Sequence, residues 1–96
     1  MDAQANETIS STLEDYLETI LVLTNEKGAA RVRDISVCLG VHKSTVTSAL
    51  KSLCDKGLLN YAPYEIATLT DEGKKIAKGV RRIHKTIYRF LKDTLL

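Results

Sequence analysis

The sequence has few of the residues that build special sites or special folds. It contains no tryptophan, one phenylalanine, one proline and two cysteines. Two cysteines do not have the paired spacing of a structural zinc site, and we expect Cys38 and Cys54 to be buried free thiols. One proline and five glycines argue against a disordered chain.

Long hydrophobic runs are also absent. No apolar stretch approaches the ~20 residues that span a bilayer, and the N-terminus has neither the basic start nor the apolar core of a signal peptide. We therefore expect a cytoplasmic protein without membrane contact. Its 96 residues are enough for one small domain with a modest core.

The motifs of common catalytic sites are missing as well. The chain has no phosphate-binding glycine loop, no HExxH zinc motif and no serine–histidine–aspartate set. We therefore expect a protein that is not an enzyme.

The net charge of +2 hides a strong segregation of charge along the chain. Residues 1–28 carry six acids and one base, whereas residues 70–96 carry eight bases and three acids. A basic face can dominate the local field even when the net charge is small. The basic residues near the C-terminus are spread around a predicted helix, so a solvated helix face is an equally good interpretation.

Residues 31–59 contain the most informative pattern in the chain. Apolar residues with helical spacing run from Val32 to Leu39, stop at Gly40, resume at Val46 and end before Gly57. Two helices joined by so short a break form a helix-turn-helix.

The outward face of the second helix is polar and carries no acid before Asp55. A face of hydroxyls and cations suits the major groove of DNA, where phosphates repel carboxylates. Its members are His42, Lys43, Ser44, Thr45, Thr47, Ser48 and Lys51. Because none of them is Arg, Asn or Gln, we expect modest direct base readout, with phosphate contacts by Lys43, Lys51, Arg31 and Arg33.

The segments on either side complete a winged helix. Ser11 with Glu14, or Thr12 with Asp15, has the spacing of a capping box before an amphipathic helix that ends at Gly28. Residues 58–69 favour two short strands with a turn around Pro63. The segment 61–66 between them carries no base, so we expect no insertion into the minor groove.

A long helix is predicted to follow, with Thr70 as its N-cap. Its apolar residues repeat at steps of three or four from Ile76 to Leu95, which predicts about 25 residues and a length of ~37 Å. Such a helix overhangs a small domain and leaves an apolar stripe that needs a partner subunit or a following segment. The predicted fold is thus mostly α with a small β-hairpin: a winged helix-turn-helix followed by a long fourth helix.

The chain resembles the metal-dependent repressors related to the diphtheria-toxin repressor, and most of all their manganese transport regulator branch. The resemblance rests on LEDYLETILVL (Leu13–Leu23), VRDISVCLGVHKSTVTSALKSLCDKGLL (Val32–Leu59), LTDEGKKIA (Leu69–Ala77) and RRIHKTIYRFL (Arg81–Leu91). It implies a polar tail (1–10), a winged helix-turn-helix DNA-binding domain (11–70) and a linking helix (71–96). That helix leads toward a dimerisation domain that is absent from this chain.

The resemblance also implies a metal site formed by Asp15, Glu18 and His84. Two carboxylates and an imidazole suit Mn²⁺ or Fe²⁺ better than a thiolate-rich set would. The ligand set is incomplete, because relatives take their remaining ligands from the dimerisation domain. Relatives also often have an acid where this chain has Tyr88, so we expect no second metal.

The function implied is a metal-responsive transcriptional repressor that binds a palindromic double-stranded DNA operator as a homodimer. The residues leave two alternatives open. One is a metal-independent winged-helix regulator or an isolated DNA-binding fragment. The other is a winged-helix module that binds protein instead of DNA.

Overall fold

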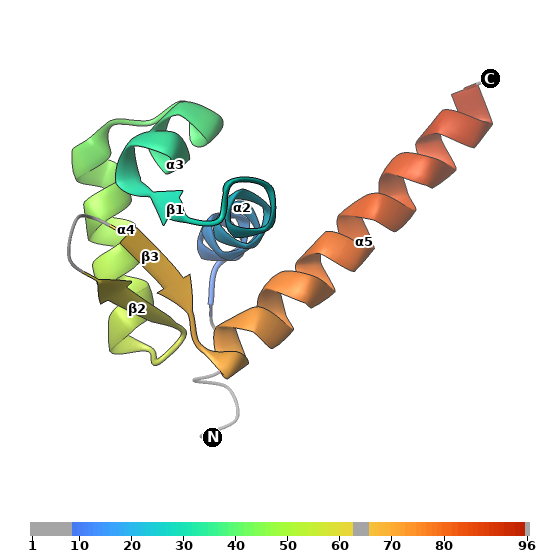
Figure 1. Ribbon diagram of the computed structural model, residues 1–96. Helices are drawn as coiled ribbons and strands as arrows, with labels where there is room; N and C mark the ends of the chain where they lie inside the picture. Colours follow the sequence, from blue (N-terminus) through green and yellow to red (C-terminus); the bar gives the residue numbers. More distant parts are fainter. Residues whose placement is uncertain (1–8, 63–65, 96) are drawn as a thin grey trace.

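The computed structural model describes the backbone of residues 9–62 and 66–95 and the side chains of residues 9–61 and 66–84. Four helices and three strands make up this described part (Figure 1). In chain order they are α2 (Ser11–Lys27), β1 (Ala30–Arg31), α3 (Val32–Leu39), α4 (Lys43–Asp55), β2 (Leu59–Ala62), β3 (Ile66–Leu69) and α5 (Asp71–Leu95). The winged helix-turn-helix followed by a long helix is confirmed.

Helix α2 begins one residue earlier than the capping pattern predicts. Ser10 is the N-cap, and its side chain accepts a hydrogen bond of 3.2 Å from the backbone N–H of Leu13. Ser10, Ser11 and Thr12 are consecutive hydroxyl residues, and spacing alone does not show which of them is the N-cap. Ile9 packs partly against the core, so the domain's contacts include the end of the predicted tail. Residues 1–8 of that tail lie outside the described residues.

Ser36 holds the turn of the helix-turn-helix. Helix α3 ends at Gly40, whose φ of 68° is a left-handed conformation that glycine adopts without strain. The Ser36 carbonyl accepts hydrogen bonds from the backbone N–H groups of Gly40 and Val41, and the Ser36 hydroxyl donates to the Val41 carbonyl at 2.5 Å. One residue therefore fixes the position from which α4 starts.

The predicted hairpin belongs to a three-stranded antiparallel sheet of order β1-β3-β2. Strand β3 lies in the middle, with Ala67 opposite Ala30 of β1 and opposite Tyr61 of β2. Strand β1 was not predicted, because two residues are too few to show an alternating pattern.

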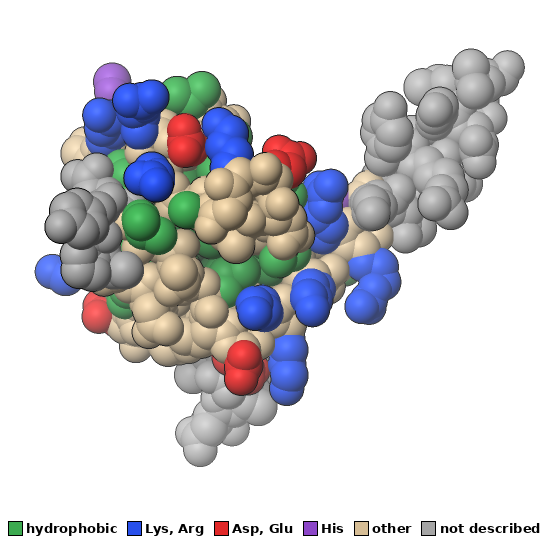
Figure 2. Space-filling view, in the orientation of Figure 1, with side chains coloured by type: hydrophobic (Ala, Val, Ile, Leu, Met, Phe, Trp, Pro, Cys, Tyr) green, Lys and Arg blue, Asp and Glu red, His purple; other side chains and the backbone are tan. Residues whose placement is uncertain are grey.

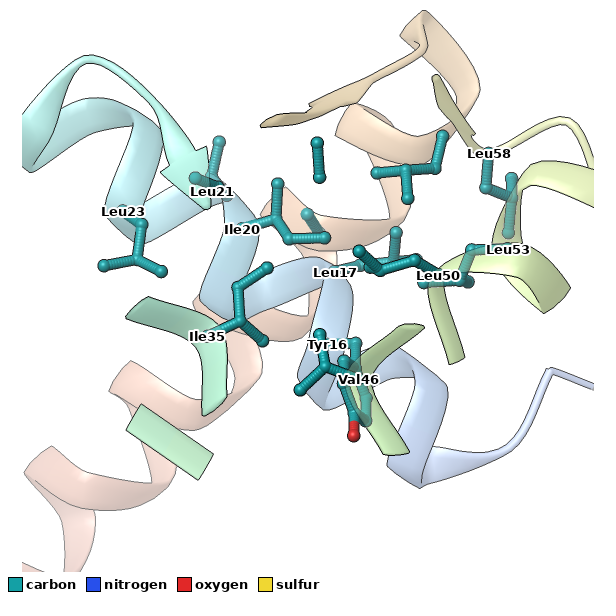
Figure 3. Packing of buried hydrophobic residues seen from close by; sticks show 14 of the residues in the cluster. Tyr16, Leu17, Ile20, Leu21, Leu23, Ile35, Val46, Leu50, Leu53 and Leu58 are labelled. Carbon is teal, nitrogen blue, oxygen red and sulfur yellow. The ribbon is translucent and has the colours of Figure 1, made fainter. Parts of the chain in front are cut away.

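The core gathers around α2. Leu17 and Ile20 are fully buried in its middle and belong to one cluster with buried residues of α3, α4 and the sheet (Figure 3). Helix α4 contributes three fully buried side chains to the same cluster: Val46, Leu50 and Leu53. Each leucine or isoleucine removed from water in this way contributes about 1.5–3 kcal/mol.

Helix α5 is anchored at its start and then leaves the domain. The Thr70 hydroxyl accepts a 3.1 Å hydrogen bond from the Gly73 N–H and donates to the Gly57 carbonyl at 2.9 Å, which confirms Thr70 as the N-cap. Ala77 and Val80 are buried, whereas Ile83 is 59% exposed. Beyond His84, which still reaches Glu18 of α2, the helix stands clear of the other elements (Figure 1).

The prediction that both thiols are buried is wrong for Cys38, which is exposed, while Cys54 is half-buried; both are free. Helix α3 buries a narrow face made by Val32, Ile35 and the partly buried Leu39, and Cys38 lies about a quarter turn away from it. None of the described helices is both long and apolar enough to cross a bilayer.

Candidate functional site

Helix α4 presents the predicted polar face to solvent. Val46, Leu50 and Leu53 recur at helical spacing and point into the core. The polar residues between them therefore point outward. The predicted members of this face are all exposed: His42, Lys43, Ser44, Thr45, Thr47, Ser48 and Lys51. His42 is the N-cap residue, and its side chain makes no capping hydrogen bond.

The hydroxyls on this face are not equivalent. The Thr47 hydroxyl donates to the Lys43 carbonyl at 2.9 Å, so its proton is used within the helix. Thr47 therefore offers an external partner its oxygen lone pairs and its methyl group. Within the part of the chain that the structure describes, the hydroxyls of Ser44, Thr45 and Ser48 make no hydrogen bond and are available to donate or accept.

Basic side chains border this face. Arg31 and Arg33 are both exposed, as predicted, at β1 and in the first turn of α3. Figure 2 shows basic side chains gathered near the turn between α3 and α4, and a second basic group along the first half of α5. Asp34 is the acid of the first turn of α3, and its carboxylate lies 3.8 Å from the ammonium of Lys27. Basic side chains thus gather around the start of α4, as binding to phosphates requires. Residues 63–65 of the turn between β2 and β3 lie outside the described residues.

The structure brings Asp15, Glu18 and His84 together, although α2 and α5 are far apart in the sequence. Each offers a ligand atom, and these atoms all lie within 4.8 Å of one another. The Nδ1 atom of His84 is 2.8 Å from Oε1 of Glu18. Since a carboxylate only accepts, Nδ1 carries the proton, and a neutral His84 keeps the lone pair on Nε2.

Arg81 joins this cluster and was not singled out from the sequence. Its Nη1 atom lies 3.6 Å from Oε2 of Glu18, the carboxylate oxygen that does not face His84. The Glu18 side chain is 15% exposed, whereas those of Arg81 and His84 are 44% and 49% exposed. The position three residues before His84 places Arg81 on the same helix face, which is the one sequence feature that indicates this contact.

An open groove of about 510 Å³ runs beside the cluster between α2 and α5. Its lining combines four cations with one amide and one leucine: Lys74, Lys78, Arg81, Arg82, Asn25 and Leu21. Arg81 therefore belongs both to the groove and to the carboxylate–histidine cluster.

Sequence comparison connects the chain with named regulators. The family described as iron dependent repressor, N-terminal DNA binding domain, matches residues 8–67. The HTH-type transcriptional regulator MntR of Bacillus subtilis is 42% identical over 81 residues, which are 84% of this chain and 57% of the relative. The chain thus spans little more than half the length of the curated relatives that it matches.

Solved structures with the same fold are also regulators by name. Transcriptional regulator Tm0710 from Thermotoga maritima superposes with a TM-score of 0.58 at 28% identity, over 84% of this chain and 61% of that one. The S. aureus MepR–DNA complex superposes with a TM-score of 0.69 at 18% identity, over 94% of this chain and 67% of that one. The second likeness shows the winged-helix fold alone. These names agree with the expectation that the chain is not an enzyme.

Proposed function

Because the chain belongs to the family of iron-dependent repressor N-terminal DNA-binding domains, we propose that it is the DNA-binding part of a metal-responsive transcriptional repressor. The observation that carries the proposal is the exposed face of α4, which has no acid before Asp55 and presents hydroxyls and cations opposite a buried aliphatic face. A helix of this kind fits the major groove of a double-stranded operator.

Two groups of residues are expected to contact different parts of the DNA, the base edges and the phosphates. Thr45 and Ser48 offer hydroxyls to base edges, and the Thr47 methyl offers an apolar contact to thymine. The exposed basic residues contact phosphates and set the position on the duplex: Arg31, Arg33, Lys43 and Lys51. His42 and Ser44 lie at the start of the helix, where backbone N–H groups also favour a phosphate.

The donor set of Asp15, Glu18 and His84 fits a divalent cation such as Mn²⁺ or Fe²⁺. Carboxylate oxygens and an imidazole nitrogen are the ligands these ions prefer, and no thiolate lies in the cluster. When bound, the cation supplies positive charge where two acids face each other. Asp15 and Glu18 would hold it from α2 and His84 would hold it from α5, so the site would link the two helices. Water or a second chain would supply the remaining ligands.

We further propose that the repressor acts as a homodimer on a palindromic operator, in the cytoplasm where that DNA lies. The exposed Ile83 on α5 supports an association through this helix, because a helix that projects from a small domain needs a partner for its apolar residues.

A gel shift at low salt tests both parts of the function. Operator and random duplexes are titrated with the protein with and without added Mn²⁺ or Fe²⁺, because phosphate contacts weaken steeply as salt rises. We expect the operator to bind more tightly than random DNA and the metal to strengthen that binding. Equal affinity for the operator with and without metal would contradict the metal response and leave a metal-independent regulator. No binding at low salt would leave a module that binds protein.

Matched variants separate base reading from folding. The double variant Thr45→Ala, Thr47→Ala removes the two threonines of the exposed face, and Thr24→Ala removes an exposed threonine at the end of α2. We expect the double variant to lose preference for the operator by about 1–3 kcal/mol, and Thr24→Ala to leave it unchanged. An unchanged preference in the double variant contradicts base reading by α4.

A further inference from the structure

Arg81 forms an ion pair with Glu18, one of the carboxylates that are proposed to hold a cation. Its guanidinium lies 3.6 Å from Oε2 of Glu18, while His84 lies 2.8 Å from Oε1 of the same carboxylate. Both oxygens of Glu18 therefore have a partner within the protein. Asp15, by contrast, is exposed and makes no ion pair in the described part of the chain.

We propose that Arg81 is an internal competitor for the divalent cation and thereby sets the metal concentration at which the repressor responds. This inference rests on the proposed metal site of Asp15, Glu18 and His84. A divalent cation that uses both oxygens of Glu18 has to displace the guanidinium, and one that uses a single oxygen has to bind beside a fixed positive charge.

Formal charge supports the competition. Asp15 and Glu18 together carry about −2 at neutral pH, and Arg81 reduces the charge of the cluster to about −1. Attraction for a divalent cation scales with this charge, and the low exposure of Glu18 limits how far water screens it. Arg81 is therefore expected to weaken metal binding.

The groove beside the cluster supplies a matched control. Lys78 lines the same groove as Arg81, but no ion pair connects it to Glu18. Replacing Lys78 removes the same charge from the same region without freeing a carboxylate oxygen. A comparison of the two positions therefore separates direct competition from the general field of the basic groove.

The test is a titration with Mn²⁺ alone, in which electron paramagnetic resonance measures the free ion. The proteins are wild type, Arg81→Gln, Arg81→Lys, Lys78→Gln and Glu18→Gln. We expect Arg81→Gln to bind Mn²⁺ about three- to tenfold more tightly than wild type, and Lys78→Gln to stay within about twofold. Arg81→Lys, which keeps the charge, lies closer to wild type, and Glu18→Gln loses binding.

Thermal unfolding without metal checks that each variant is folded. We expect similar melting temperatures for all variants, because a partly exposed ion pair contributes little to stability. Equal Mn²⁺ affinity in wild type and Arg81→Gln, with binding lost in Glu18→Gln, overturns the role of Arg81 and leaves the metal site standing. Equal tightening by Lys78→Gln also overturns it, since the general field then explains the effect. Absence of Mn²⁺ binding in both wild type and Arg81→Gln overturns the proposed metal site together with the inference.

Discussion

Gly73 packs directly against the backbone of Leu58. A Cβ atom added at Gly73 would lie 2.0 Å from the Leu58 carbonyl oxygen, which is backbone and cannot swing away. The backbone N–H of Thr70 donates to that same carbonyl at 3.2 Å. The start of α5 is thereby held against the segment that connects α4 to β2.

The variant Gly73→Ala is expected to destabilise the domain by at least about 1–3 kcal/mol, because the new methyl group forces the two segments apart. Gly79→Ala is the control in the same helix, since nothing lies within 4 Å of its Cβ position. That change is expected to stabilise the protein by about 0.5–1 kcal/mol. Urea unfolding followed by circular dichroism measures both. Equal stability of the two variants would contradict the close contact.

The variant Ser36→Ala is expected to loosen the helix-turn-helix. It removes the hydroxyl that donates to the Val41 carbonyl at 2.5 Å, at a cost of about 1 kcal/mol in unfolding free energy. Operator affinity is expected to fall as well, because the turn fixes where α4 begins. Ser48→Ala is the control for stability, since its exposed hydroxyl bonds to no other described residue. If Ser36→Ala unfolds at the same urea concentration as wild type, the hydroxyl does not hold the turn.

Lys51→Gln is expected to weaken binding to every duplex by a similar factor. An exposed lysine that contacts a phosphate releases about one counterion, so the slope of log affinity against log salt falls by about 0.9 in magnitude. Lys56 is also exposed but follows the last residue of α4, and Lys56→Gln is the control with the same charge change. Fluorescence anisotropy at several salt concentrations measures the slope. A slope unchanged in Lys51→Gln would place this residue away from the DNA.

The two thiols are expected to react at different rates with a disulfide reagent such as DTNB. Burial and the neighbouring charge of Asp55 raise the pKa of the Cys54 thiol above its ordinary value, although a backbone hydrogen bond with Tyr61 acts in the opposite direction. Less thiolate forms at Cys54 at pH 8, so the exposed Cys38 reacts first. The Cys54 rate is expected to keep rising as the pH increases beyond 9.

Single-cysteine variants assign the two rates. Cys38→Ser leaves the slow thiol, and Cys54→Ser leaves the fast one. A fast reaction that survives in Cys38→Ser would show that Cys54 is open to solvent.

The sequence predicted the features that repeat within one helix. The buried Leu50 and Leu53 and the exposed Thr45 follow from a period of 3.6 residues, and Thr70 has the chemistry of an N-cap. Strand β1 was missed because its pairing partner Ala67 lies far along the chain, and two residues carry no period.

The candidate metal cluster could not be found from spacing alone. Glu18 and His84 are 66 positions apart, so only resemblance to a family connected them before the fold was known. The contact of Arg81 with Glu18 depends on how α5 packs on α2 and is a property of the folded chain. Cys38 is a case in which the sequence-based prediction was wrong. We expected it to be buried because core positions lie next to it in the sequence, but α3 turns it toward solvent.

The central place of α2 has a mechanical consequence. Figure 1 shows α2 between α5 and the pair α3 and α4. Asp15 and Glu18 meet His84 of α5, whereas Leu17 and Ile20 belong to the buried cluster that includes residues of α4. The proposed metal site and the proposed DNA-reading helix are therefore separated by one helix about 10 Å thick. Under the proposed function, a tilt of α2 would move both sites together, so the metal response would need no long relay of side chains.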